Sequence, residues 1–63
     1  MHPNYRWISS VSAAERLGLS IRDLYRLIDR ADLPAYRIAG EIRLLAHEVE
    51  DFRDKFPDPG ELL

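Results

Sequence analysis

The feature that most constrains this chain is the short break Leu17-Gly18-Leu19-Ser20 between two helical patterns. Glycine readily adopts the left-handed backbone conformation that ends helices, so Gly18 predicts the end of a first helix. Ser20 stands three positions before Asp23, and this spacing is typical of a capping box that begins a second helix. Because so short a connection makes the two helices cross sharply, the sequence predicts a helix-turn-helix motif rather than an antiparallel helix pair.

The second helix is expected to fade after Arg30, because Leu33 precedes Pro34 and a residue before proline is disfavoured in a helix. Residues 21–31, placed at about 100° per residue, form an amphipathic pattern. Its apolar arc consists of Ile21, Leu24, Leu27, Ile28 and Ala31. Its polar arc consists of Arg22, Asp23, Arg26, Asp29 and Arg30, and Tyr25 lies on the boundary. Two interpretations of the arginines remain open. They either form a solvated face with intrahelical pairs to Asp23 and Asp29, or they form a surface that binds an anion.

The size and composition of the chain exclude several classes of protein. A chain of 63 residues forms one small domain, which buries only about 60% of its unfolded surface, so we expect no deep catalytic cavity. The absence of cysteine excludes disulfides and thiolate metal sites and favours a cytoplasmic protein. No apolar run approaches the roughly 20 residues of a membrane span, so we expect no membrane partner.

The charge of the chain is unevenly distributed. The net charge of -2 taken alone argues against a nucleic-acid partner. Residues 1–45, however, hold seven arginines and five acidic residues, whereas residues 46–63 hold two basic and six acidic residues. Such a chain can still present a locally basic surface, with a weaker attraction for phosphates than a strongly basic domain has.

The N-terminal residues 1–7 show no periodicity, and we expect them to form an extended arm. Trp7 and Ile8 are expected to cover the core. Tyr5 and Arg6 offer the alternative of a phosphate contact.

A first helix is expected to run to Leu17, capped by Ser9 or Ser10. Ser12 and Glu15 form a competing capping box, but a helix that began there would have only one and a half turns.

Residues 36–44 alternate apolar and basic side chains around Gly40, which predicts a β-hairpin. Ala39 suits a two-residue turn poorly, because that turn needs a positive φ at its position, so we expect a three-residue loop of residues 39–41. This register pairs Ile38 with Ile42, Arg37 with Arg43, and Tyr36 with Leu44. Two arginines directly opposite each other destabilise a sheet, so we interpret them as an anion-binding pair. In the alternative interpretation, Asp32 or Glu41 neutralises them or they remain in water.

A third helix is predicted over residues 46–56. Leu45, Val49, Phe52 and Phe56 recur at helical spacing and complete the core. Its acidic residues Glu48, Glu50, Asp51 and Asp54 are interpreted as a solvated face rather than as metal ligands or a general acid and base, because no pocket-forming sequence surrounds them. The segment Pro57-Asp58-Pro59-Gly60 ends this helix, and residues 61–63 are expected to form a loose tail.

The chain contains no pattern typical of catalysis. His2 and His47 lie far apart, no cluster has metal-ligand spacing, and no glycine-rich phosphate loop or serine elbow occurs. We therefore expect no enzyme activity, no cofactor and no metal site.

Several of these features together form one pattern. It reads Ser9-x-x-x-Ala13-Ala14-x-x-Leu17-Gly18-x-Ser20, then residues 24–28 and 33–38, with Gly40 and Arg43. In this pattern the chain resembles the MerR-like winged helix-turn-helix domains of phage excisionases and related small DNA-binding regulators over residues 8–53. The resemblance implies a mainly α fold with a small β-hairpin, that is, three short helices plus a two-stranded wing. Together with the predicted elements, the resemblance divides the chain into an arm of residues 1–7, a DNA-binding domain of residues 8–56 and a tail of residues 57–63.

The resemblance also implies how such a domain binds double-stranded DNA. The second helix enters the major groove, and the wing lies along the backbone or the adjacent minor groove. Carried over by position, the helix contacts are Ser20, Arg22, Tyr25, Arg26 and Arg30, and the wing contacts are Arg37 and Arg43. This chain departs from the family pattern at Ser10, Asp23, Ala39 and Glu41. Asp23 and Glu41 weaken the expected affinity for DNA.

Three functions fit these observations. The first is an excisionase that binds and bends attachment-site DNA cooperatively to assist a phage integrase, and the second is a small MerR-like transcription regulator. The third is a protein-interaction module that has lost DNA binding. A single short helix and wing discriminate poorly among genomic sites, so several copies must act together. The acidic third helix and the arginine-bearing wing favour head-to-tail self-association on DNA.

Overall fold

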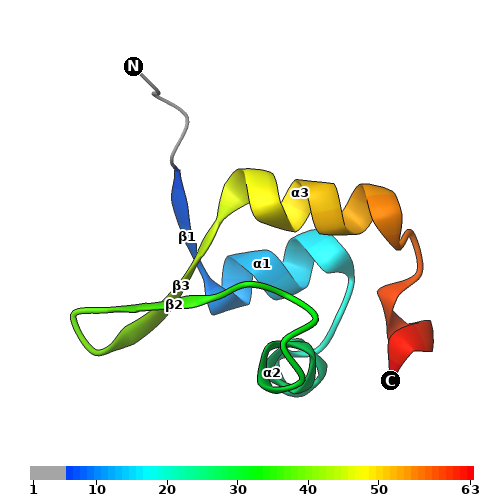
Figure 1. Ribbon diagram of the computed structural model, residues 1–63, viewed down its shortest axis with the longest axis horizontal. Coiled ribbons are helices and arrows are strands. Elements are labelled where there is room, and N and C mark those ends of the chain that lie inside the picture. Colours follow the sequence, from blue (N-terminus) through cyan, green and yellow to red (C-terminus); the bar gives the residue numbers. More distant parts are fainter. Residues whose placement is uncertain (1–5) are drawn as a thin grey trace.

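The computed structural model describes residues 6–63. Its elements follow in the order β1 (Trp7–Ser9), α1 (Ser10–Leu17), α2 (Ile21–Asp29), β2 (Tyr36–Ile38), β3 (Glu41–Leu45), α3 (Ala46–Lys55) and a 3-10 helix, η1 (Pro59–Leu62). Helix α1 packs against both α2 and α3, and in Figure 1 it lies between α3 above and α2, seen end-on, below. The β2–β3 hairpin projects to one side of the helices (Figure 1). The predicted class, three short helices with a small β-hairpin wing, is confirmed.

The first helix begins and ends as its local sequence predicts. Ser9 is the cap, because its Oγ accepts a hydrogen bond from the Ser12 N–H, with 3.1 Å between Oγ and N. The competing start at Ser12 is therefore not used. Gly18 has a φ of 69°, and the Leu19 N–H donates to the Ala14 carbonyl at 2.9 Å, which closes the end of α1.

The second helix ends close to where the sequence predicts. Its last residue is Asp29 and its C-cap is Arg30, so Ala31 lies outside it. Ala31 has a φ of 62°, and the Asp32 N–H donates to the Leu27 carbonyl at 3.0 Å. This hydrogen-bond pattern ends a helix with one left-handed residue, a place that glycine usually occupies. Ala31 is consequently exposed and does not belong to the apolar arc.

The buried part of the apolar arc of α2 is also shorter at its start. Leu24 and Leu27 are fully buried, whereas Ile21 is 39% exposed. Ile21 lies in the first turn of α2, where a side chain has helix neighbours on one side only. Ile21 therefore lies on the apolar arc but outside the core.

A third strand, β1, extends the predicted hairpin into a three-stranded antiparallel sheet of order β1-β3-β2. In β1, Ile8 pairs with Leu44 and is buried, as expected for a residue that covers the core. Trp7 is 45% exposed, and its ring meets Tyr36 edge-on with 5.4 Å between ring centroids. The predicted arm therefore ends before Trp7, and residues 1–5, including Tyr5, lie outside the described residues.

The hairpin turn contains two residues, not three. Ala39 and Gly40 have φ angles of 53° and 82°, as a two-residue primed turn requires. The register pairs Tyr36 with Arg43, Arg37 with Ile42, and Ile38 with Glu41. The predicted pairing of Arg37 with Arg43 is wrong, because one residue of shift moves a side chain to the other face of a strand.

The core is a single apolar cluster between the helices and the sheet. It consists of Ile8, Ala13, Ala14, Leu17, Leu24, Leu27, Leu33, Leu44, Val49 and Phe52. The C-terminal residues also contact it, since Pro59 is buried and Leu62 and Leu63 pack against the cluster. The expectation of a loose tail is therefore wrong.

Candidate nucleic-acid interface

The start of α2 is fixed by the predicted serine cap. Ser20 has an extended backbone, and its Oγ accepts a hydrogen bond from the Asp23 N–H at 3.1 Å between Oγ and N. Ser20 itself is exposed. The cap therefore sets the first turn of α2 at the surface, next to Arg22.

Two arginines lie one turn apart on the exposed arc of α2. Among residues 6–63, Arg22 has no carboxylate within 4 Å of its guanidinium. Arg26 lies 3.6 Å from Asp23 (Nη1 to Oδ1), and its side chain is 52% exposed. The interpretation of an intrahelical pair is thus confirmed for Asp23. Exposed pairs of this kind contribute only about 0.3–0.5 kcal/mol, so Arg26 is easily released to a ligand.

Tyr25 connects the two helices of the motif. Its hydroxyl lies 3.0 Å from the Oγ of Ser10 in α1, in a half-buried position. This contact gives a hydrogen-bond partner to Ser10, one of the residues at which the chain departs from the pattern that it resembles. Tyr25 therefore positions α2 against α1, in addition to any contact that it makes with DNA.

Arg30 contacts residues outside α2. Its Nη1 donates to the Leu62 carbonyl at 2.8 Å, and its Nε lies 3.5 Å from Oδ2 of Asp32. Both partners lie beyond the end of α2. Arg30 thus connects the end of α2 to the C-terminal segment, a contact that no local sequence pattern indicates.

The two arginines of the wing occupy opposite faces of the hairpin. Arg37 shares a face with Ile42, which packs against the core, so this face is turned toward the helices. Arg37 is exposed, and its Nη1 lies 3.5 Å from the Gly40 carbonyl. Arg43 lies on the outer face and forms an ion pair with Glu41. The alternative interpretation, that Glu41 neutralises a wing arginine, is confirmed for Arg43.

The structure divides the predicted site residues among different places. Ser20 caps α2, and Arg22 and Arg26 lie on its exposed arc, whereas Arg37 lies on the helix side of the wing. Ile21 joins them as an exposed apolar side chain between Ser20 and Arg22. The sequence indicated the exposure of Ile21 only through its position as the first residue of α2.

A comparison with protein families agrees with this geometry. The family model described as Helix-turn-helix domain matches residues 7–56, from β1 through α3. The chain belongs to this helix-turn-helix family. Searches of curated proteins and of solved structures gave no match. Membership implies that the helix-turn-helix domain binds DNA, and domains of this kind are typically non-enzymatic.

The described part of the helix-turn-helix domain shows neither a metal cluster nor a membrane-spanning helix. Within residues 6–63, no group of three His, Cys, Asp or Glu side chains is arranged to hold a metal ion. The helices of this range are all too short or too polar to cross a membrane.

Proposed function

We propose that this helix-turn-helix domain binds specific DNA sequences as an excisionase of the MerR-like winged type. In this role it binds and bends attachment-site DNA cooperatively and assists a phage integrase, in the cytoplasm where the DNA lies. The observation that carries the proposal is the serine-capped start of α2, which holds Arg22 and Arg26 exposed one turn apart. The resemblance to excisionases rests on residues 8–53.

Helix α2 supplies the sequence-specific contacts. Arg26 reaches a guanine edge with two hydrogen bonds, a contact worth about 1–3 kcal/mol of discrimination. That energy exceeds the contribution of its exposed pair with Asp23, so Arg26 exchanges the carboxylate for the base. Arg22 and Ser20 contact phosphates or neighbouring bases, and Ile21 packs against a thymine methyl group.

The remaining predicted contacts have different weights. Arg37 contacts a phosphate or a narrow minor groove from the helix side of the wing. Arg43 contributes less because Glu41 already neutralises it. Tyr25 contributes through the placement of α2 on α1, and Arg30 through its contact with the C-terminal segment, before any contact with DNA.

Several copies act together on one DNA site. The free protein is a monomer, and copies associate head-to-tail on tandem sites through opposite charges. The acidic partner is the outer face of α3, represented by Asp54, and the basic partner is the arginine-bearing wing of the next copy. The DNA bends as copies accumulate.

Two alternative functions fit this structure. A small MerR-like transcription regulator uses the same DNA-binding surface and differs only in the protein that it recruits. A protein-interaction module that has lost DNA binding is favoured by the net charge of -2 and by the ion pairs that occupy Arg26 and Arg43.

A binding and recombination assay separates the three functions. Gel shifts with attachment-site DNA and with random DNA, each at two salt concentrations, measure specific affinity, and circularly permuted fragments measure bending. Excision is then measured with the integrase encoded beside the gene. We expect tighter binding to attachment-site DNA, bending, and integrase-dependent excision. Specific binding without stimulated excision favours the regulator, and no binding at low salt favours the interaction module.

A further inference from the structure

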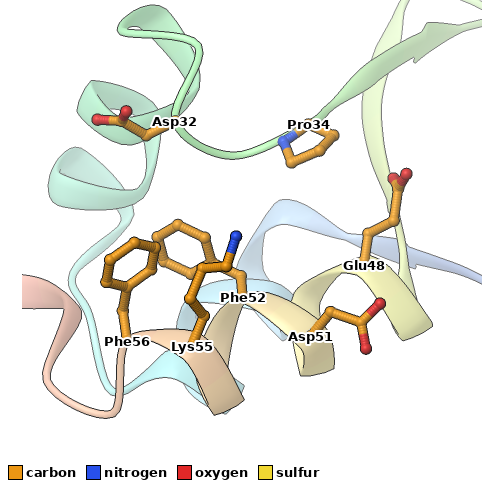
Figure 2. Close-up of a pocket in the computed structure, with 7 residues that line it drawn as sticks. All are labelled: Asp32, Pro34, Glu48, Asp51, Phe52, Lys55 and Phe56. Carbon is orange, nitrogen blue, oxygen red and sulfur yellow. The ribbon is translucent and has the colours of Figure 1, made fainter.

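A groove runs between α3 and the connection from α2 to β2. It has a volume of about 320 Å³ and is lined by Asp32, Pro34, Glu48, Asp51, Phe52, Lys55 and Phe56 (Figure 2). The sequence indicated no pocket around the acids of α3. That expectation is wrong, because the connection that follows α2 crosses opposite α3 and forms the second wall.

The groove has an apolar floor and an acidic rim. Phe52 and Phe56 form the floor, with 5.0 Å between ring centroids (Figure 2). Asp32, Glu48 and Asp51 add three carboxylates to the lining, and Lys55 adds an ammonium group that lies beside Phe52 in Figure 2. Within residues 6–63, Asp51 has neither a hydrogen bond nor an ion pair to its side chain. The rim therefore offers a carboxylate to a cation from outside.

A second groove shares one lining residue with the first. It has a volume of about 340 Å³ and is lined by Trp7, Tyr36, Leu45, His47 and Glu48. Glu48 lines both grooves and accepts a hydrogen bond from the Tyr36 hydroxyl, with 3.0 and 3.1 Å from the hydroxyl to its two carboxylate oxygens. The two grooves thus share Glu48, and both contain aromatic side chains. We call the two grooves together the surface along α3.

The surface along α3 is separate from the proposed DNA contacts. None of Arg22, Arg26 and Arg37 lines either groove. The carboxylates on its rim repel phosphates, so DNA is not its ligand. The surface is therefore available while α2 is bound to DNA.

We propose that this groove docks a cationic, apolar segment of a second protein. An aliphatic or aromatic side chain of that segment packs on Phe52 and Phe56, and a flanking Arg or Lys binds Asp51. Charge complementarity selects this ligand, since the rim carries three carboxylates against one lysine. The wing of another copy is the other cationic candidate, and the sedimentation experiment below tests it.

A pair of synthetic peptides tests this docking. The first is a capped hexapeptide with Leu-Phe at its centre and two arginines on each side, and the second has glutamates in place of the arginines. Titration is followed by amide NMR shifts and by the fluorescence of Trp7, the one tryptophan of the chain, which lines the adjoining groove. We expect the arginine peptide to shift the amides of Asp51, Phe52 and Phe56 in a saturable way. Equal shifts with both peptides, or none, overturn the proposal.

Matched variants of α3 separate the groove from the general acidity of the protein. Asp51→Lys should weaken the arginine peptide at least about fivefold, since it replaces an attraction by a repulsion. Asp54→Lys makes the same charge change on the same helix, at an exposed residue that lines neither groove, and should leave the affinity nearly unchanged. Equal weakening by both variants overturns the groove as the site.

Two further measurements test whether a second copy of the chain or DNA occupies the groove. They also separate the docking proposal from the DNA-binding proposal. Sedimentation of the free protein with and without Asp51→Lys tests a second copy, and a change in self-association assigns the groove to that copy instead. Peptide affinity is also measured with DNA present, and competition by DNA overturns the separation of the two surfaces. Peptide binding without any DNA binding leaves the docking proposal standing and removes only the proposed function.

Discussion

Arg37 and Arg43 lie on opposite faces of the β2–β3 hairpin, since Arg37 pairs with Ile42 and Arg43 pairs with Tyr36. The two-residue turn at Ala39 and Gly40 sets this register. The arginines therefore do not form one anion site. Glu41 neutralises Arg43 on the outer face, whereas Arg37 stays available on the helix side.

The wing arginines should contribute unequally to DNA binding. Arg37→Ala should weaken binding to every DNA sequence and reduce the slope of log affinity against log salt by about 1, as the loss of one phosphate contact does. Arg43→Ala is the matched control and should have a smaller effect, because it removes an arginine that is already paired. Anisotropy titrations at four salt concentrations measure both slopes. Equal slopes for the two variants contradict the assignment of faces.

Arg26 should determine sequence preference more than general affinity. Arg26→Ala should reduce specific binding by about 1–3 kcal/mol, with a smaller loss on random DNA, because a bidentate base contact is lost. Arg30→Ala is a useful comparison, since its contact with the Leu62 carbonyl predicts lower stability and little change in preference. Competition gel shifts report the specific-to-random ratio. A proportional loss on both DNAs identifies Arg26 as a phosphate contact only.

The turn residue Ala39 should be a site for stabilisation. The left-handed conformation costs a residue other than Gly, Asn or Asp about 1 kcal/mol of conformational energy. Ala39 adopts this conformation, with a φ of 53°. Ala39→Asn should therefore raise the free energy of unfolding by about 0.5–1 kcal/mol, since Asn-Gly is the preferred two-residue turn. Urea denaturation measures the change. Ala39→Val is the opposing control, and a Val variant as stable as the Asn variant argues against this turn.

Binding to tandem sites should be cooperative and should depend on the outer face of α3. DNA with one, two and three direct repeats is titrated while the successive gel-shifted bands are followed, and we expect the second site to fill at lower protein concentration than an isolated site. Asp54→Lys should reduce this cooperativity, whereas the groove variant Asp51→Lys should not. The head-to-tail proposal fails if the two sites fill independently, or if the free protein sediments as a stable dimer.

The serine caps that begin α1 and α2, and the glycine that ends α1, are the part of this fold that the sequence determines by itself. The capping hydrogen bonds of Ser9 and Ser20, and the left-handed Gly18 between α1 and α2, join atoms within a few residues of each other. Helical periodicity likewise predicted the buried Leu24 and Leu27. These features depend on backbone chemistry and on the period of a helix, both of which can be read from a short segment.

Only the tertiary structure decided the features that depend on distant partners. Strand β1 has three residues and no periodicity of its own, and it forms because β3, more than 30 positions later, offers an open edge. The contact of Arg30 with Leu62 and the groove between α3 and the α2–β2 connection arise in the same way, from segments that meet only after folding. The hairpin register was missed for a different reason. The left-handed Ala39 is locally unfavourable, and the packing of Ile42 and Leu44 against the helices outweighs that cost.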